Sequence, residues 1–316
     1  MRVIDSAGVD QALDFPALVA ALDDTLRSDV VVPVRHHHTI SRADGDATHL
    51  IMPAWAAGSG GFIGIKLVNV FPGNGARGLP SVMGTYVLMN GDTGAPLGVI
   101  DGTRLTLWRT AATSALASRY LSRPDAATHL MVGAGALSPF FLRAHRAVRP
   151  IRRSIIWNKT RANAEKVAAI LAAEGIVVEV ADDLEAAVRA ADIISTATLS
   201  KVPLVRGAWL QPGAHLDLVG AFTPDMRETD DDCVLRSRIF VDTRGGALKE
   251  GGDLVQPIKD GLITEDVVEA DLFDLARGKV TAARAAEDIT LYKSTGGAAF
   301  DLATAALVAK ACGISA

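Results

Sequence analysis

Two glycines separated by one residue stand where an apolar run meets a segment with a helical pattern. The run His129-Leu130-Met131-Val132 leads into Gly133-Ala134-Gly135-Ala136-Leu137-Ser138. Gly133 permits a tight turn, and Gly135 lets the backbone approach a pyrophosphate at the N-terminus of the following helix. Ser138 replaces a third glycine and is still small enough for helix and strand to pack closely. Short glycine-rich turns are common, but a strand before and a helix after make the context that a dinucleotide site requires.

The end of the next strand of such a unit sets the choice between NAD and NADP. An NAD site places an acidic residue there, which binds the ribose 2′-hydroxyl. In this chain the strand Ser154–Trp157 is followed by Asn158-Lys159-Thr160-Arg161, which offers hydrogen-bond donors and two positive charges. These groups suit a 2′-phosphate better than a bare ribose. We therefore predict NADPH as the cofactor, with NADH as a poorer donor; the alternative is a solvated basic turn at a helix start.

Strands and helices alternate around these motifs, which predicts a parallel sheet covered by helices. The alternation extends from His129 to Thr243, and we expect a Rossmann-type domain over residues 125–295. The predicted strands are His129–Val132, Ser154–Trp157, Val177–Val180, Ile193–Thr196, His215–Val219 and Ile239–Val241. The predicted helices are Pro139–Ala147, Arg161–Ala173 and Leu184–Ala190.

The rest of the chain, residues 1–124 and 296–316, is expected to form a second, α+β domain into which the first is inserted. Its predicted elements are a helix at Phe15–Arg27, strands at Val30–Val34, Thr48–Met52, Phe62–Val70 and Thr85–Met89, and a helix that begins after Asp101 and ends before Pro124. Beyond Asp253 the chain becomes helical and polar. The final Ala-rich helix, Phe300–Cys312, has only Asp301 and Lys310 as charges and is predicted to pack back onto the first residues. The fold class is α/β.

Composition excludes several kinds of partner. The 316 residues are 49% hydrophobic and 22% charged with a net charge of −4, and no Lys/Arg run exceeds two residues, so nucleic acid is not expected. No apolar stretch approaches about 18 residues, and the first residues lack a signal-peptide pattern, so we predict a cytoplasmic protein without membrane contact. Cys233 and Cys312 follow no metal or redox spacing and are predicted to be free thiols.

Two clusters invite a metal interpretation that their spacing does not support. Adjacent side chains of a strand point to opposite faces, so His36-His37-His38 cannot converge simply on one ion. Asp230-Asp231-Asp232 lacks the alternating ligands and glycine of a calcium loop and is expected to be a solvated helix start. No metal site is predicted.

Beyond these features, the chain resembles the ornithine cyclodeaminase/μ-crystallin family over nearly its full length. The shared motifs, in order, are Pro33-Val34-Arg35, Gly64-Ile65-Lys66, Leu79-Pro80-Ser81, Thr93-Gly94-Ala95-Pro96-Leu97, Asp101-Gly102, Arg109-Thr110-Ala111-Ala112, Val132-Gly133-Ala134-Gly135, Val219-Gly220-Ala221, Pro224-Asp225 and Tyr292-Lys293-Ser294. The resemblance implies that the α+β domain binds substrate and forms a homodimer.

The resemblance also implies a substrate site made of Arg35, Lys66, Thr85 and Arg109. An arginine fork matches a carboxylate, and a lysine in an apolar pocket can exchange a proton with a substrate nitrogen. Arg35 and Lys66 are the predicted catalytic residues; without the motifs they would be read as a surface ion-pair residue and a strand lysine. The residues implied to line the cofactor are Thr85, Arg109, Thr110, Gly133, Gly135, Ala136, Leu137, Asn158, Lys159, Thr160, Thr198, Leu199, Val219 and Ser294.

One departure from the family pattern bears on the reaction. Where cyclodeaminases and the related alanine dehydrogenases have a catalytic aspartate, this chain has Phe222, within Gly220-Ala221-Phe222-Thr223-Pro224-Asp225. Phenylalanine cannot activate water or accept a proton, and Asp225, three residues on, is expected to cap a turn or helix. The resemblance then favours the ketimine reductase branch, which reduces 1-pyrroline-2-carboxylate or 1-piperideine-2-carboxylate to L-proline or L-pipecolate. The alternatives are an ornithine cyclodeaminase or alanine dehydrogenase, and a μ-crystallin-like NADPH-binding protein without turnover.

Overall fold

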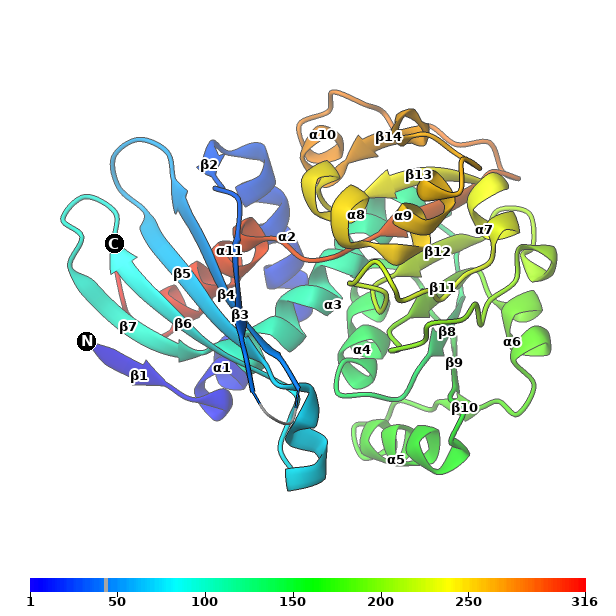
Figure 1. The fold of residues 1–316 in the computed structure, drawn as a ribbon, viewed down its shortest axis with the longest axis horizontal. Helices are drawn as coiled ribbons and strands as arrows, with labels where there is room; N and C mark the ends of the chain where they lie inside the picture. The colour runs from blue at the N-terminus through cyan, green and yellow to red at the C-terminus, as the bar shows by residue number, and fades with distance from the viewer. Residues whose placement is uncertain (43–44) are drawn as a thin grey trace. The chain divides into compact units, whose positions relative to one another are not determined.

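The computed structural model describes residues 1–42 and 45–316, and these form two compact units (Figure 1). Unit 1 consists of Met1–Thr110 and Gly297–Ala316, and unit 2 of Ala111–Gly296. Unit 2 therefore interrupts unit 1 along the chain. The first junction lies inside a long helix, α3 (Gly102–Leu121), at 110/111 and not at 124/125, and the second lies at 296/297, one residue beyond the expected position.

Unit 1 is built on a seven-stranded sheet with the order β1-β7-β6-β5-β4-β2, to which β3 adds by pairing with β4. Its pairs are antiparallel except β1 with β7. The strands are β1 (Arg2–Ile4), β2 (Val30–Val31), β3 (His36–Ile40), β4 (Ala47–Ala56), β5 (Phe62–Val70), β6 (Val82–Asn90) and β7 (Pro96–Asp101). A short 3-10 helix, η1 (Pro72–Arg77), joins β5 to β6.

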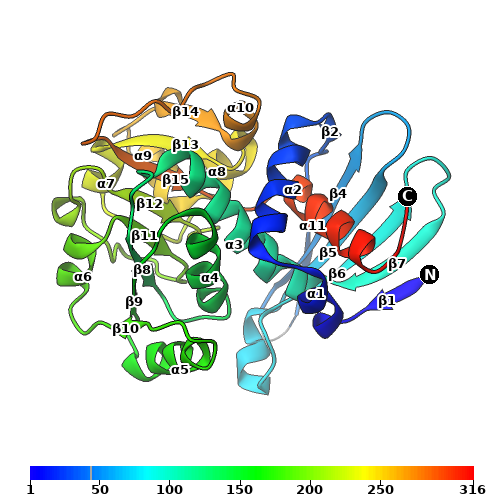
Figure 2. The same cartoon turned by 180° about the vertical axis from the view of Figure 1, so that it is seen from behind.

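Helices cover one face of this sheet (Figure 2). They are α1 (Ser6–Ala12), α2 (Phe15–Arg27) and α11 (Ala298–Ala311). The predicted range of α2 is confirmed: the Asp14 carboxylate accepts a hydrogen bond from the Ala17 N–H at 2.9 Å, which caps the helix, and Leu18, Leu22 and Leu26 form its buried stripe. Helix α11 packs against α2, β4 and β5, so the tail does return to the first residues.

The other face of the same sheet has an apolar band without a covering helix in the described part of unit 1. It consists of Trp55, Ile63, Ile65, Val87 and Met89, which are paired across β4, β5 and β6 and are all half-buried. Because side chains alternate along a strand, these residues point away from Lys66 and Val68, which face α11.

Unit 2 is an eight-stranded parallel sheet in the order β10-β9-β8-β11-β12-β15-β13-β14. Its strands are β8 (Thr128–Val132), β9 (Arg153–Trp157), β10 (Glu179–Val180), β11 (Ile193–Thr196), β12 (His215–Leu218), β13 (Ser237–Val241), β14 (Val268–Asp271) and β15 (Ile289–Lys293). Its helices, besides the second half of α3, are α4 (Ser138–Val148), α5 (Arg161–Ala172), α6 (Leu184–Ala190), α7 (Asp231–Leu235), α8 (Arg244–Glu250), α9 (Gly252–Lys259), α10 (Leu272–Ala276), η2 (Gly207–Trp209) and η3 (Glu265–Val267). The chain reverses its direction of winding between β8 and β11, and the crevice at such a point is where α/β folds bind ligands.

The six strands predicted for this unit are present, with bounds that differ by at most two residues. The expectation that the chain is helical beyond Asp253 was wrong for two segments, which form the strands β14 and β15. Strand β15 is fully buried between β12 and β13. Its sequence, Ile-Thr-Leu-Tyr-Lys, hides this role because Thr290 and Lys293 are polar. Thr290 meets His215 at 2.9 Å and the Lys293 ammonium meets Asp253 at 3.1 Å, so both polar groups are satisfied inside the sheet.

The clusters considered for metals have ordinary structural roles. His36, His37 and His38 lie exposed on β3, and Asp230 caps α7 by accepting from the Cys233 N–H. Within residues 1–42 and 45–316, no group of three or more His, Cys, Asp or Glu residues is arranged to hold a metal ion. No helix among these residues is both long and apolar enough to cross a membrane.

Candidate active site

The glycine-rich turn after β8 has the geometry that the motif predicts. Gly133 has a φ of +110°, a conformation that favours glycine, and its N–H donates to the Trp157 carbonyl at 2.8 Å. A side chain there would also collide, because a Cβ would lie 2.8 Å from the Ala197 carbonyl oxygen. The buried Ser138 hydroxyl donates to the Gly133 carbonyl at 2.9 Å, which joins the start of α4 to the turn. Gly135 and Ala136 are exposed at the tip of the turn.

The turn after β9 contacts the glycine-rich turn through Asn158. The Asn158 Oδ1 accepts from the Ala134 N–H at 3.2 Å, and its Nδ2 donates to the Thr160 carbonyl at 2.9 Å. Lys159 is exposed beside it, whereas Arg161 forms ion pairs with Glu165, at 2.8 Å, and with Asp182. The charge of Arg161 is therefore offset by two carboxylates, whereas Lys159 is exposed.

The remaining predicted cofactor residues of unit 2 lie at the same edge of the sheet. Thr198 and the exposed Leu199 follow β11, Val219 follows β12, and Ser294 follows β15. The carboxyl ends of parallel strands lie at one edge of a sheet, so these loops follow the same edge as the glycine-rich turn, and the loop after β11 adjoins it. The Ser294 hydroxyl donates to the buried Asp242 carboxylate at 2.8 Å, as do the N–H groups of Thr295 and Gly296.

Unit 1 has a buried charged centre on the helix-covered face of its sheet. Lys66, on β5, is 2% exposed, and its Nζ lies 2.8 Å from Oδ1 and 2.7 Å from Oδ2 of Asp301 on α11. The Arg109 Nε, on α3, lies 3.0 Å from Asp301 Oδ1. One carboxylate thus faces two cations, so the centre has an excess of positive charge, which suits an anionic ligand.

Burial and charge place the proton equilibrium of Lys66 close to neutrality. Burial, followed by the nearby Arg109 charge, lowers the pKa of the lysine from 10.5 to about 8, while Asp301 opposes the shift. The Arg35 charge lowers the pKa further, so Arg35, half-buried just before β3, lies within electrostatic reach of the centre. An ammonium with this pKa can give up a proton near physiological pH.

Tyr86 completes the surroundings of this centre. It is paired with Lys66 across β5 and β6, and burial raises the pKa of its hydroxyl well above the usual value, as does the Asp301 charge. Its ring lies over Gly64, where a Cβ would come within 1.8 Å of the hydroxyl oxygen. The glycine of the Gly64-Ile65-Lys66 motif is therefore needed to make room for tyrosine.

The structure does not bring every predicted substrate residue into the centre. Thr85 is exposed and precedes Tyr86, so on an alternating strand its side chain points to the face opposite Lys66. Thr110 is buried in α3, next to Arg109.

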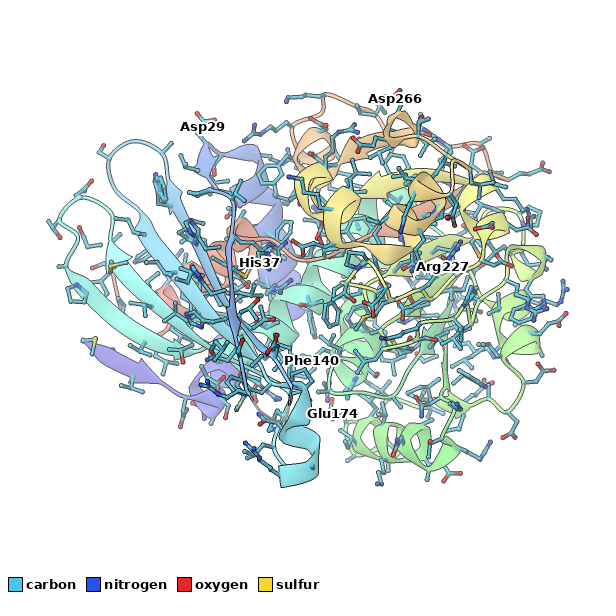
Figure 3. The ribbon with its side chains drawn as sticks, in the orientation of Figure 1. Asp29, His37, Phe140, Glu174, Arg227 and Asp266 are labelled. Atoms are coloured by element: carbon cyan, nitrogen blue, oxygen red, sulfur yellow. The ribbon has the colours of Figure 1, made fainter. Side chains whose placement is uncertain are left out.

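Figure 3 shows the side chains of both units, with Asp29 and His37 labelled in unit 1 and Arg227 in unit 2.

Asp301 is the functional residue that sequence reasoning missed. It was noted only as one of two charges in an Ala-rich helix. A lone acid in such a helix is itself a signal, because a carboxylate on a buried face must find a cation. Its partner lies on a strand 235 positions earlier, which the local pattern does not reveal.

The loop after β12 has an apolar side chain at the position where the family resemblance implies a catalytic aspartate. Phe222 is half-buried in the loop after β12, and its N–H donates to the Gly220 carbonyl at 3.0 Å. Asp225 does not start a helix. It lies in an exposed turn, where it accepts from the Thr223 hydroxyl at 2.6 Å and pairs with Lys201 at 2.7 Å.

This combination defines a class of protein: a Rossmann-type dinucleotide-binding fold inserted into a unit with a buried, positively charged centre. The chain belongs to the ornithine cyclodeaminase/mu-crystallin family, whose profile matches residues 7–312.

Within this family, the chain is similar to several reductases. The chain is 39% identical to a Delta(1)-pyrroline-2-carboxylate reductase of Paracoccus denitrificans, over 89% of this chain and 92% of the relative. It is 33% identical to the ketimine reductase mu-crystallin of Rattus norvegicus, over 94% and 91% of the two chains. A solved structure of Thermococcus litoralis Delta(1)-pyrroline-2-carboxylate reductase, in complex with NADH and L-proline, superposes with a TM-score of 0.93 at 30% identity and covers 100% of this chain and 99% of that one.

Proposed function

We propose that this protein reduces a small cyclic imino acid, 1-pyrroline-2-carboxylate or 1-piperideine-2-carboxylate, to L-proline or L-pipecolate with a nicotinamide cofactor. The observation that carries the proposal is the buried Lys66, which pairs with Asp301 and whose pKa burial and the charges of Arg109 and Arg35 lower to about 8. The reductases among its relatives, and the proline bound in one of their structures, support the same reaction.

The residues of the centre divide the reaction between them. Arg35 and Arg109 neutralise the substrate carboxylate, as an arginine fork can do with two parallel hydrogen bonds. Lys66 donates a proton to the imine nitrogen as the C=N double bond becomes a single bond. A bound reduced nicotinamide would supply the hydride for the carbon, so that hydride and proton together balance the reduction of the C=N bond. Asp301 keeps the ammonium form of Lys66 populated.

The loop after β12 supports reduction over deamination. Expulsion of ammonia and hydrolysis of an imine both need an acid/base group on the reacting carbon's side. Phe222 has none, and Asp225 is engaged with Lys201 in an exposed turn. A non-catalytic NADPH-binding role would leave the buried Lys66 centre without a purpose, although burying two cations beside one carboxylate costs stability.

We propose NADPH as the preferred cofactor. The support is the absence of an acidic side chain at the end of β9 in Asn158-Lys159-Thr160, together with the exposed Lys159 ammonium. An ammonium beside a 2′-phosphate gains a charge-assisted contact that the 2′-hydroxyl of NADH does not offer. Arg161 contributes less, because Glu165 and Asp182 already pair with it.

We further propose that the protein is a homodimer formed through unit 1. The support is the apolar band of Trp55, Ile63, Ile65, Val87 and Met89, which no described helix of unit 1 covers. A contiguous apolar face of this kind marks an interaction surface in soluble proteins. A cytoplasmic location also stays a proposal; it rests on the free Cys233 and Cys312.

The test mixes purified protein with freshly generated 1-pyrroline-2-carboxylate and follows NADPH absorbance, with ornithine and NAD as a parallel assay. The expected result is NADPH oxidation with formation of L-proline, and no ammonia from ornithine. Lys66→Met should abolish the reaction, whereas Lys166→Met, at an exposed position of α5, should not change it. Ammonia release without NADPH oxidation would overturn the proposal.

A further inference from the structure

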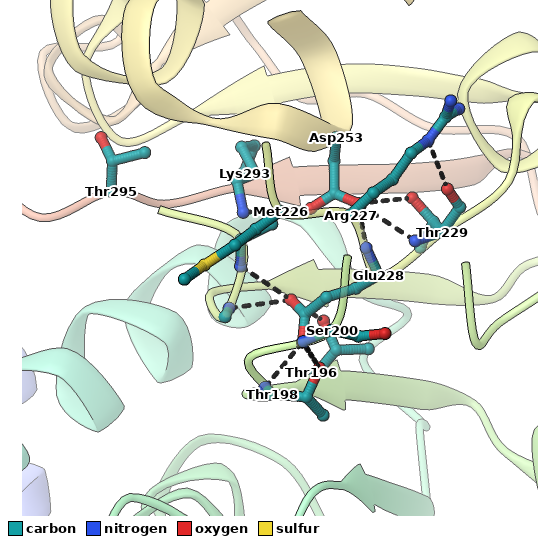
Figure 4. A network of polar contacts seen from close by, with 12 residues as sticks. Thr196, Thr198, Ser200, Met226, Arg227, Glu228, Thr229, Asp253, Lys293 and Thr295 are labelled. Carbon is teal, nitrogen blue, oxygen red and sulfur yellow. Dashed lines mark hydrogen bonds and ion pairs between the residues drawn. The ribbon is translucent and has the colours of Figure 1, made fainter. Parts of the chain in front are cut away.

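Glu228 lies fully buried in unit 2, in the segment between β12 and α7, and its carboxylate is surrounded by hydrogen-bond donors (Figure 4). Its Oε1 accepts from the Thr198 N–H at 2.7 Å and from the Thr198 hydroxyl at 2.8 Å. Its Oε2 accepts from the Thr196 hydroxyl at 2.7 Å and from the N–H groups of Gly220 and Ala221 at 2.8 and 3.2 Å. One side chain therefore receives five contacts.

These donors come from the end of β11 and from the loops that follow β11 and β12, so the carboxylate joins two segments beyond the point where the paired strands end. Thr198 follows β11 and Gly220 follows β12, and the two strands are parallel neighbours. A Cβ at Gly220 would lie 2.3 Å from both the Thr198 nitrogen and the Glu228 Oε1, so the loop backbones and the carboxylate are in direct contact. The loop after β11 in turn touches the glycine-rich turn, since a Cβ at Gly133 would meet the Ala197 oxygen at 2.8 Å.

Glu228 is itself held in place from its other side. Its N–H donates to Asp253 Oδ1 at 2.8 Å, and the Thr229 N–H donates to the same oxygen at 3.0 Å. Asp253 Oδ2 pairs with the Lys293 ammonium at 3.1 Å. Lys293 is the last residue of β15, so this chain of contacts also reaches the end of that strand and gives the Tyr292-Lys293-Ser294 motif a structural role.

We propose that Glu228 is a positioning residue for the cofactor: its carboxylate sets the spacing of the loops after β8, β11 and β12 and so fixes the affinity for the nicotinamide dinucleotide. We call the contacts of the Glu228 carboxylate with Thr196, Thr198, Gly220 and Ala221 the clamp. The identity of the ligand rests on the proposed function, whereas the clamp rests on these contacts. Glu228 is distinct from the lining residues because it acts through the backbone of the loops.

The chemistry of the clamp requires a carboxylate. Both oxygens receive at least one backbone N–H, which can only donate: Thr198 on Oε1, and Gly220 and Ala221 on Oε2. Glutamine has the same shape, but either orientation of its amide turns an NH2 group toward a backbone N–H. An isosteric substitution should therefore force the loops apart instead of preserving them.

The experiment compares wild type with Glu228→Gln and with Asp217→Asn. Asp217 is a second buried carboxylate of unit 2, and it accepts a hydrogen bond from the Ser195 hydroxyl at 2.7 Å within the sheet. The readouts are the Kd of NADPH in the absence of substrate, KM and kcat, and hydrogen exchange of peptides that cover residues 197–200 and 219–222. We expect Glu228→Gln to raise the Kd and KM of NADPH about tenfold or more, with faster exchange confined to the two loops. Asp217→Asn should leave the Kd of NADPH, KM and kcat near wild type, and it should cause no faster exchange confined to the two loops.

Two outcomes would overturn the positioning role: an unchanged Kd in folded Glu228→Gln, or a loss of binding accompanied by uniformly faster exchange. If Glu228→Gln does not fold, Thr196→Val removes one donor and keeps the carboxylate, and it should raise the Kd about threefold. A wild-type protein that binds NADPH tightly but reduces no cyclic imine would refute the proposed function and leave the test of Glu228 intact.

Discussion

The Lys66 ammonium lies 2.8 Å from the Asp301 carboxylate, although the two residues are 235 positions apart in the chain. Both are almost fully buried, and Arg109 contacts the same carboxylate at 3.0 Å. A lysine buried alone would become neutral, whereas a lysine held by a full ion pair would keep its proton too firmly for catalysis. The competition between Asp301 and the arginines sets the balance between these limits.

The first prediction is a pH dependence of the reductase reaction. Lys66 has a pKa of about 8 and must be protonated to act as the acid, so kcat/KM should fall as pH rises through about 8. Asp301 raises the pKa of the lysine, so Asp301→Asn should move this limb to lower pH. Asp23→Asn, which removes an ion pair with Arg27 on α2, should not move it. A limb that stays in place or moves to higher pH in Asp301→Asn would contradict the assignment.

Cofactor choice should respond to Lys159. Lys159→Asp replaces the ammonium with a carboxylate, which repels a 2′-phosphate and can accept a hydrogen bond from a ribose hydroxyl. We expect the ratio of kcat/KM for NADPH over NADH to fall by about 10- to 100-fold. Lys166→Asp makes the same charge change at an exposed position of α5 and should shift the ratio far less. Equal shifts in both variants would mean that only the overall charge matters.

Loss of the Lys66 side chain should lower kcat far more than loss of the Phe222 side chain. Phe222→Ala removes an apolar side chain without acid/base function, and kcat should stay within about tenfold of wild type. Lys66→Met removes the proton donor, so kcat should fall by about 100- to 10,000-fold. Steady-state kinetics with 1-pyrroline-2-carboxylate measures both. A larger loss of kcat in Phe222→Ala than in Lys66→Met would contradict the assignment of Lys66 as the proton donor.

Asp217 should make stability depend on pH. Burial raises the pKa of this carboxyl from 3.8 to about 7. Between these values the folded protein retains a proton that the unfolded chain loses, so the free energy of unfolding falls as pH rises. Relative to wild type, Asp217→Asn should gain on the order of 2–3 kcal/mol between about pH 4.5 and 7.5 in denaturant titrations. Glu185→Gln, at an exposed ion pair, should show no such trend.

The apolar band of unit 1 should govern oligomeric state. Ile63→Lys places a charge in the middle of the band, next to Trp55 and Met89, and should convert a dimer into monomers in light scattering after size exclusion. Val177→Lys is the matched control, since Val177 is 80% exposed on unit 2. If Ile63→Lys is still a dimer, the interface lies outside the apolar band. If the wild-type protein is a monomer, the proposed dimer does not exist.

Local patterns were enough to predict much of the fold. The ranges of α2, β5, α6 and β11 agree with their predicted ranges to the residue, because each has a periodicity or an apolar run that one segment contains by itself. The glycine-rich turn was found for the same reason. Strand β15 was missed because its Thr290 and Lys293 are satisfied only by His215 and Asp253, which come from elsewhere in the chain.

The sequence by itself determined the family resemblance and the dinucleotide motif at Gly133, since both depend on residue types at fixed spacing. Through the resemblance it also predicts Arg35, Lys66 and Arg109 as cationic substrate residues. Only the tertiary structure decided that Asp301 pairs with Lys66, that Thr85 lies on the opposite face of the sheet, and that Glu228 joins the loops after β11 and β12. Partners far apart in the chain meet only when the sheets assemble, and the low dielectric around them then makes each contact strong enough to set a pKa or a loop spacing.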